Sequence, residues 1–318
     1  MAAGIRQKDS VAPRPGRAGG AVAWRGAGLR RERFHGYLFI APAFLLLAAI
    51  ILYPLIHAFQ TSLHRTRGLR IDFIGLGNYE KILAEPAFWD SLAISFAFTG
   101  IAVALHVALG LALALLLNEV RFLKTAIRIA FLTPWMVAPA IGAIIWMWLL
   151  EPQFGVVNYV LRSAGLISEY KIWLGEPALA FGSIVAVDVW RGVPFIMLLM
   201  LAGLQGIPRE QYEAAEIDGA TRPQRFRYVT LPNLRYLLIV ASTLDFINTI
   251  RHFDIIKVMT QGGPARATEV LPVLLYNRAF LANRFGEAAA IGVALLVIVL
   301  ALTIVYILLT RPGRASES

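Results

Sequence analysis

The sequence lacks several features that enzymes and nucleotide-binding subunits rely on. It contains no cysteine, which excludes disulfide bonds and thiol chemistry. No lysine follows a glycine, so the G-K-[ST] end of a phosphate-binding loop is missing. The histidines do not cluster at metal-ligand spacing, and no Ser-His-Asp or paired-carboxylate pattern is present. We therefore expect the chain to be no enzyme and to bind neither ATP nor a metal ion itself.

Charged residues are also scarce. Only 16% of the 318 residues are charged while 58% are hydrophobic, and the mean hydropathy is +0.65. This composition is typical of a polytopic membrane protein in contact with lipid. The formal net charge of +10 does not indicate a nucleic-acid partner, because much of the excess flanks apolar segments, where the positive-inside rule places it.

Six apolar segments are long enough to cross a hydrocarbon core of about 30 Å, which predicts an all-α fold with both termini in the cytoplasm. We place the spans at residues 37–59, 91–117, 126–150, 178–204, 236–256 and 288–309. This gives a six-helix domain at 37–310 between a basic disordered tail, 1–36, and a short tail, 311–318. Pro134 and Pro139 break the third span, and the outside loop after it contains GVVNYVLRSAGL, for which we predict a short surface helix.

The most polar stretch between two apolar segments, residues 208–232, has the sequence PREQYEAAEIDGATRPQRFRYVTLP. Pro208 is suited to start a helix, which we predict from Arg209 to Ala220. We expect Gly219 to end that helix, since glycine tolerates the left-handed turn that ends many helices. The small apolar face of this helix cannot bury a core alone, so we expect it to dock into another protein.

Within this stretch, Glu213-Ala214-Ala215, then Gly219 after three residues, then Val229, and then Leu231-Pro232 match the spacing EAA-x3-G-x9-I-x-LP. The one departure is valine for isoleucine. The segment resembles the cytoplasmic loop of the membrane-spanning subunits of binding-protein-dependent ABC importers, which have the type I permease fold. The alternative is an ordinary solvated loop helix that happens to contain EAA.

The resemblance covers residues 37–309. YLFIAPAFLLLAAIILYPLIHAFQTSL from Tyr37, FIGLGNYEKIL from Phe73, VWRGVPFIMLLMLAGLQGIP from Val189 and FDIIKVMTQGGP from Phe253 look like the first, MalF-like permease of carbohydrate importers. The chain has no counterpart of the large extra outside domain of the maltose protein. The resemblance implies a multi-pass protein of the bacterial inner membrane. It also implies three kinds of partner: a second, MalG-like permease, two ATPase subunits that bind ATP and Mg²⁺, and an extracytoplasmic solute-binding protein.

The resemblance further implies that the 208–232 loop couples the permease to the ATPases. The residues expected to do so are Glu213, Ala214, Ala215, Asp218, Gly219, Leu231 and Pro232. A carboxylate on a short helix can pair with arginine or lysine across an interface, and small residues allow close approach. We expect Leu231 and Pro232 to fix the loop against the fifth span.

Ionisable groups inside spans are costly and indicate function. Those expected to line the solute path are Asp188, Arg191, Asp245, Asn248 and Arg251, with Trp146 as an aromatic face for a sugar ring. An alternative is that Asp188 and Arg191, at i and i+3, only neutralise each other. Trp146 can equally belong to an interfacial aromatic belt. We expect His106 to be a buried polar residue between helices.

These features favour a subunit that moves a sugar or related polyol when ATP is hydrolysed on separate chains. Within the same machinery, glycerol-3-phosphate or another polar solute is the competing substrate. A membrane-embedded transferase would need acidic or histidine-rich motifs that are not found. An ion-coupled secondary transporter would instead work without an ATPase, which copurification and uptake experiments can distinguish.

Overall fold

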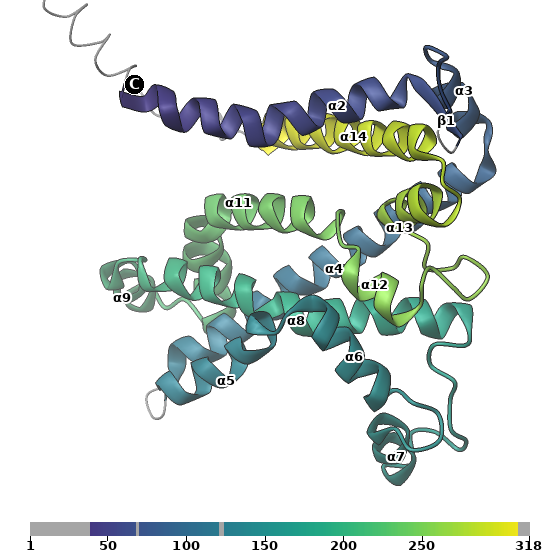
Figure 1. The fold of residues 1–318 in the computed structure, drawn as a ribbon. Helices are drawn as coiled ribbons and strands as arrows, with labels where there is room; N and C mark the ends of the chain where they lie inside the picture. Colours follow the sequence, from purple (N-terminus) through teal and green to yellow (C-terminus); the bar gives the residue numbers. More distant parts are fainter. Residues whose placement is uncertain (1–38, 68–69, 121–123, 311–318) are drawn as a thin grey trace, which may run out of the picture. The chain divides into compact units, whose positions relative to one another are not determined.

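A computed structural model describes residues 39–67, 70–120 and 124–310 (Figure 1). The chain divides into two compact units, one ending at Ile56 and the other beginning at His57. The predicted tails at 1–36 and 311–318 lie outside the described residues.

The described part of the first unit is a single helical stretch. A π-helical turn, η1 (Ala48–Leu52), leads into α2 (Tyr53–Ser62), which continues into the second unit. Pro54 lacks the N–H that would continue the i→i−4 bonding, which accounts for the wider turn before it. Together these residues form a helix, Phe39–Ser62, that is long and apolar enough to cross a membrane, where the first span was predicted.

The second unit is helical except for one small hairpin. Its elements before the coupling region are β1 (His64–Arg67), β2 (Arg70–Phe73), α3 (Gly77–Ala84), α4 (Pro86–Glu119), α5 (Lys124–Met136), α6 (Pro139–Leu149), α7 (Val156–Ser163) and α8 (Pro177–Gln205). The later elements are α9 (Arg209–Ile217), α10 (Arg222–Arg225), η2 (Phe226–Thr230), α11 (Leu231–Thr249), α12 (Asp254–Met259), α13 (Leu271–Tyr276), η3 (Asn277–Leu281) and α14 (Phe285–Thr310).

The hairpin was not predicted, because RTRGLR lacks the alternation of apolar and polar residues that marks a strand. Strands β1 and β2 pair antiparallel, with His64 opposite Phe73. The Asn78 side chain from α3 donates to the main-chain oxygens of Ser62 (2.7 Å) and His64 (2.9 Å). The N–H of Gly286 donates to Thr66 Oγ1 at 3.0 Å. These bonds fix the hairpin on α3 and on the start of α14.

Helix α8 is the centre of the second unit. In its most apolar 18-residue stretch 61% of residues are buried, against 17% in α14. Its first half packs with α4, α6 and α12, and its second half with α4 and α11. Gly110 of α4 allows a close approach to α8, since a Cβ there would lie 2.7 Å from Ile196 Cγ2. α8 is therefore held by neighbours on several sides.

The predicted spans fall on helices, with two differences. Four helices are individually long and apolar enough to cross a membrane: Phe39–Ser62, Pro86–Glu119, Pro177–Gln205 and Phe285–Tyr306. The pair α5 and α6 passes the same test together but bends by 97° at the break between Met136 and Pro139, so the described residues hold four or five candidate spans. The count of six stays a prediction.

The fifth predicted span, 236–256, is wrong at its outer end. Helix α11 begins at Leu231 and ends at Thr249, and a separate short helix, α12, follows from Asp254. Ile255 and Ile256 lie after the end of α11 and are buried in the core of the second unit. Their apolar side chains therefore reflect that core and do not mark a continuation of the span. The apolar run therefore overstated the length of the helix.

The predicted surface helix in the outside loop is present as α7. Its Asn158 is fully buried and organises the loop. The amide Nδ2 donates to the main-chain oxygens of Pro152 (3.1 Å) and Lys171 (3.0 Å). Its Oδ1 accepts from the Lys171 N–H (3.2 Å) and from Trp173 Nε1 (2.9 Å). One side chain thus joins the two ends of the loop.

We expect Asn158→Ala to loosen this loop by about 2–3 kcal/mol, because several buried partners lose their bonds at once. Limited proteolysis after Lys171 should accelerate, and Trp173 fluorescence should shift to longer wavelength. Tyr159→Ala, at an exposed neighbour on the same helix, is the matched control. An unchanged cleavage rate in Asn158→Ala would contradict this role.

Candidate functional site

Residues 208–232, which we call the coupling segment after the role that the resemblance implies, form the connection between α8 and α11. It contains α9, α10 and η2 (Figure 1). Pro208 precedes α9 in extended conformation, and Glu210 lies in the first turn, where a negative charge is stabilised by the helix dipole. The helix ends at Ile217, three residues earlier than predicted. Pro223 lies in the first turn of α10, so it starts a new helix.

Gly219 closes α9 in the left-handed conformation, with φ of +76°. Its N–H donates to the Glu216 oxygen at 3.0 Å, and the Ala220 N–H donates to the Ala215 oxygen at 2.9 Å. This pair of bonds is a Schellman motif, which favours glycine because other residues are strained at positive φ. The predicted stop at Gly219 is confirmed.

One side of α9 is fastened to the segment that leads into α11. Tyr212 Oη is 2.9 Å from Thr230 Oγ1, and Asn233 Nδ2 donates to Gln211 Oε1 at 2.8 Å. The opposite side is uncovered, and Ile217 is 86% exposed. Glu213 and Ala214 are also exposed.

Leu231 and Pro232 were expected to fix the loop against the fifth span, and the Leu231 N–H donates back to the Phe226 oxygen in η2. They are the first two residues of α11, and both are exposed. The contacts come from their neighbours: Thr230 and Asn233 bond to α9, and Leu234 is buried against α8. Pro232 lies in the first turn of α11, a position that suits proline because no N–H is needed there, and the role expected of these two residues stays a prediction.

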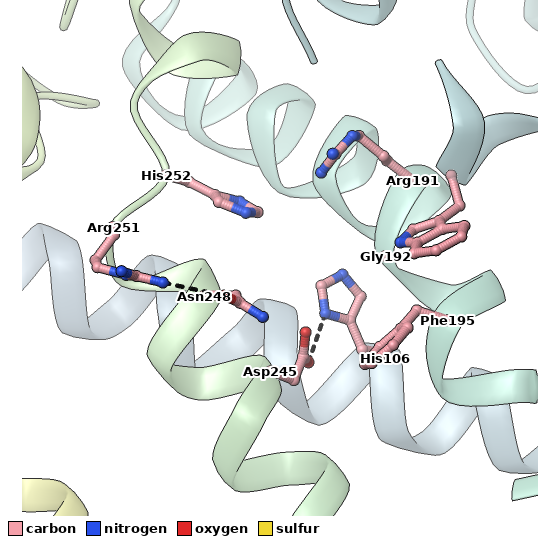
Figure 2. A pocket seen from close by; sticks show the side chains of 9 residues that line it. His106, Arg191, Gly192, Phe195, Asp245, Asn248, Arg251 and His252 are labelled. Carbon is pink, nitrogen blue, oxygen red and sulfur yellow. Dashed lines mark hydrogen bonds and ion pairs between the residues drawn. The ribbon is translucent and has the colours of Figure 1, made fainter. Parts of the chain in front are cut away.

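A cavity of about 520 Å³ lies between α8, α11, α4 and α5 (Figure 2). Its lining residues combine charged, amide and aromatic groups: His106, Trp135, Arg191, Gly192, Phe195, Asp245, Asn248, Arg251 and His252. Of the six residues predicted for the solute path, the structure brings together Arg191, Asp245, Asn248 and Arg251 on this wall.

His106, from α4, is 1% exposed and joins α4 to α8 and α11. Its Nδ1–H donates to Asp245 Oδ2 at 2.8 Å, as Figure 2 shows. Its Nε2 lies 3.2 Å from the main-chain oxygen of Asp188. Both ring nitrogens therefore face oxygen atoms of neighbouring helices. The expectation of a buried polar histidine between helices is confirmed.

Asp188 lies beside the cavity and is completely buried. Its Oδ1 accepts from His252 Nδ1 at 2.6 Å, and its Oδ2 is 3.7 Å from His106 Nε2. Within the described part of the chain it forms no ion pair with Arg191, so mutual neutralisation of the two is wrong. Asp188 instead faces His106 and His252, which are far from it in the sequence.

The remaining predicted residue, Trp146, is not among the lining residues. It packs edge-on to Trp190, with ring centroids 5.7 Å apart. The aromatic rings that do line the cavity are Trp135 and Phe195, stacked at 5.9 Å and 21°. Phe195 follows Arg191 by one helical turn, a spacing that could have identified it. Trp135 lies next to the break between α5 and α6, which a span pattern does not reveal.

Glycine at position 192 makes room for this arrangement. A Cβ there would lie 2.3 Å from His106 Nε2, closer than real Cβ contacts come. Among the described residues, no group of three or more His, Asp or Glu side chains is placed to hold a metal ion. The lining residues offer hydrogen-bonding groups and aromatic rings.

Residues 82–311 match the family model described as "Binding-protein-dependent transport system inner membrane component". The chain belongs to this family. It is a permease subunit of an ABC importer of the inner membrane, and it is not itself an enzyme. This confirms at family level the resemblance found in the coupling segment.

Several relatives of the permease match it along nearly their whole length. It is 41% identical over 286 residues to the trehalose/maltose transport system permease MalF of Thermococcus litoralis, which covers 89% of this chain and 96% of the relative. It is 35% identical to the sulfoquinovosyl glycerol permease SmoG of Agrobacterium fabrum (88% and 91% covered). The permease YcjO of Escherichia coli is also 35% identical (86% and 92%).

The permease also resembles a chain in the crystal structure of a bacterial ABC transporter involved in the import of the acidic polysaccharide alginate. The TM-score is 0.79 with 21% identity, and the match covers 91% of this permease and 99% of that chain. A likeness at this identity shows that the two share the type I permease fold.

Proposed function

We propose that this permease carries a sugar or related polyol into the cell through the cavity between α8 and α11. An extracytoplasmic binding protein delivers the solute, and a second, MalG-like permease completes the pathway. ATP is hydrolysed on two separate ATPase subunits, which bind ATP and Mg²⁺. The observation that carries the proposal is that the segment with the EAA spacing directly connects the two helices that supply most of the cavity wall.

The exposed side of α9 has the composition of a docking surface. An exposed isoleucine at the helix end, beside Ala214 and Glu213, offers an apolar contact and a carboxylate that can pair with a basic side chain. Gly219 allows a partner to approach the helix end, since no atom lies within 4 Å of where its Cβ would be. We assign this side to the ATPase subunit, with Asp218 at its edge.

The two helices on either side of the coupling segment, α8 and α11, connect it to the walls of the cavity. Arg191 lies fourteen residues before the end of α8, and Asp245 lies fourteen residues after the start of α11. At 1.5 Å per residue, each is about 21 Å from the segment. Movement of α9, passed to α11 through Tyr212 and Asn233, would therefore shift both walls of the cavity.

The cavity can hold a sugar. Asp245 and Asn248 offer oxygen acceptors for hydroxyl groups, and Arg191 and the Asn248 amide offer donors. The stacked pair of Trp135 and Phe195 offers an apolar face for a ring. A few placed polar groups beside aromatic side chains are the usual composition of a small-molecule site.

The test is uptake by the complete transporter in proteoliposomes, with the solute that the cognate binding protein carries as the labelled solute, and with trehalose and maltose compared beside it because of the relative named for them. We expect accumulation only with ATP on the ATPase side and binding protein on the other side. Phe195→Ala, in the cavity, should reduce uptake by about tenfold or more, as loss of one well-placed aromatic contact does in other sites.

Phe154→Ala, at a 74% exposed phenylalanine in the outside loop, is the matched control. Accumulation by the permease alone, driven by an ion gradient, would instead show a secondary transporter and would overturn the proposal. Uptake that survives removal of either ATPase or binding protein would do the same.

A further inference from the structure

We infer that the solute carried by this permease bears an anionic group, a carboxylate, sulfonate or phosphate, and that Arg191 binds it. The inference rests on the proposed function, because it takes the cavity between α8 and α11 as the solute site. It depends on how the charges around the cavity are distributed between paired and unpaired groups.

The carboxylate that lines the cavity, Asp245, is already paired, since it accepts from His106 Nδ1 at 2.8 Å. Asp188 lies outside the cavity lining, is completely buried, and accepts from His252 Nδ1 at 2.6 Å. The second nitrogen of His106 faces the main-chain oxygen of Asp188 at 3.2 Å. The exposed wall of the cavity therefore offers no unpaired carboxylate among the described residues to a cationic solute.

The two guanidinium groups have no such compensation. No carboxylate of residues 39–67, 70–120 or 124–310 lies within ion-pair range of Arg191, and its buried Nε has no hydrogen-bond partner there. Arg251 donates only to neutral oxygens, those of Asn248 Oδ1 (3.1 Å) and the Ile247 main chain (2.8 Å). Two guanidinium groups without a carboxylate partner among the described residues thus line the cavity.

An unpaired cation in a partly desolvated cavity is costly, and an arriving anion removes that cost. The guanidinium fork also matches the geometry of a carboxylate, sulfonate or phosphate with two parallel hydrogen bonds. Trp135 and Phe195 lie in the same cavity and would hold the ring that bears the anion. Arg191 would then act as a specificity-determining residue, with Arg251 as a second, outer cation.

Two measurements on the complete transporter test this. First, the solute released by denaturing the cognate binding protein, purified from cells grown on mixed carbohydrates and glycerol phosphate, is identified by mass spectrometry. Second, uptake of that solute, and the amount moved per ATP hydrolysed, is compared between wild type and Arg191→Gln. We expect an acidic solute and a loss of uptake of about 10- to 100-fold, the range for losing a hydrogen bond to a charged group.

Arg191→Lys should retain part of the uptake because it keeps the charge, and Arg251→Gln should show a smaller loss. Arg162→Gln, at an exposed arginine of α7, is the control and should transport as wild type. A neutral solute, or undiminished uptake of an acidic solute by Arg191→Gln, would overturn the inference while ATP-driven uptake still supported the proposed function. Uptake that needs no ATPase would overturn the proposed function itself. If Arg191→Gln does not assemble, the uptake of the acidic solute by Arg191→Lys and Arg251→Gln tests the inference, and undiminished uptake by both would overturn it.

Discussion

A Glu213→Lys permease is expected to insert into the membrane and keep its fold but to lose its ATPase subunits and its ATP-driven uptake. Glu213 is exposed on the open side of α9, without a partner among the described residues, so its reversal removes no contact within the chain. In a complex it would place like charges against each other at the proposed interface. Reversal of a buried interface charge costs about 2–5 kcal/mol, which corresponds to at least about a thirtyfold weaker association.

The measurement is copurification of the ATPase with tagged permease, together with uptake in proteoliposomes. Glu210→Lys, on the same helix one turn earlier and equally exposed, is the matched control and should copurify more nearly as wild type does. Thermal unfolding of the isolated permease should be unchanged in Glu213→Lys and at most slightly lowered in Glu210→Lys, which puts a positive charge in the first turn of α9. Normal copurification and uptake with Glu213→Lys would show that this side of α9 does not meet the ATPase.

Gly192→Ala is expected to disrupt the cavity and to destabilise the permease. The added Cβ would lie 2.3 Å from His106 Nε2 and 2.4 Å from Cε1. The ring cannot yield without breaking its bonds to Asp245 and to the Asp188 oxygen. Displacing one member of a buried charged pair costs about 3 kcal/mol or more. We expect a lower thermal unfolding midpoint and a loss of uptake of at least about tenfold.

Gly182→Ala supplies the control, because it lies on the same helix and no atom is within 4 Å of its added Cβ. Alanine favours a helix over glycine by up to about 1 kcal/mol, so that variant should be as stable as wild type or more stable. Equal unfolding midpoints for Gly192→Ala and Gly182→Ala would contradict the steric role of position 192.

Apolar runs in the sequence predicted the bounds of a helix well where polar or helix-starting residues flank the run. Helix α8 was predicted at 178–204 and is observed at Pro177–Gln205, because Pro177 suits a first turn and the polar coupling segment follows at once. The same approach failed beyond Thr249, since burial in a soluble-like core and burial in lipid select the same residues. The chain turns at 250–253, yet Ile255 and Ile256 continue the apolar pattern.

The sequence identified several residues of the candidate site but not the side chains to which they bond. Ionisable residues within spans are few, so Arg191, Asp245 and Arg251 could be singled out by cost alone. Their partners could not, because His106 is 139 residues from Asp245 and His252 is 64 residues from Asp188. Only the packing of α4 and the turn after α11 against α8 brings them together. Local spacing instead suggested a pair between Asp188 and Arg191 that does not form.

The way α9 is attached has a consequence for how such permeases can diversify. The helix is fastened to the rest of the chain by Tyr212 and Gln211 on one side and ends in the Gly219 turn. The residues facing outward can therefore be exchanged without disturbing the cavity about 21 Å away. Exchanging only the outward-facing positions of α9 could match a permease to a different ATPase, so that one ATPase could serve several importers with different solutes.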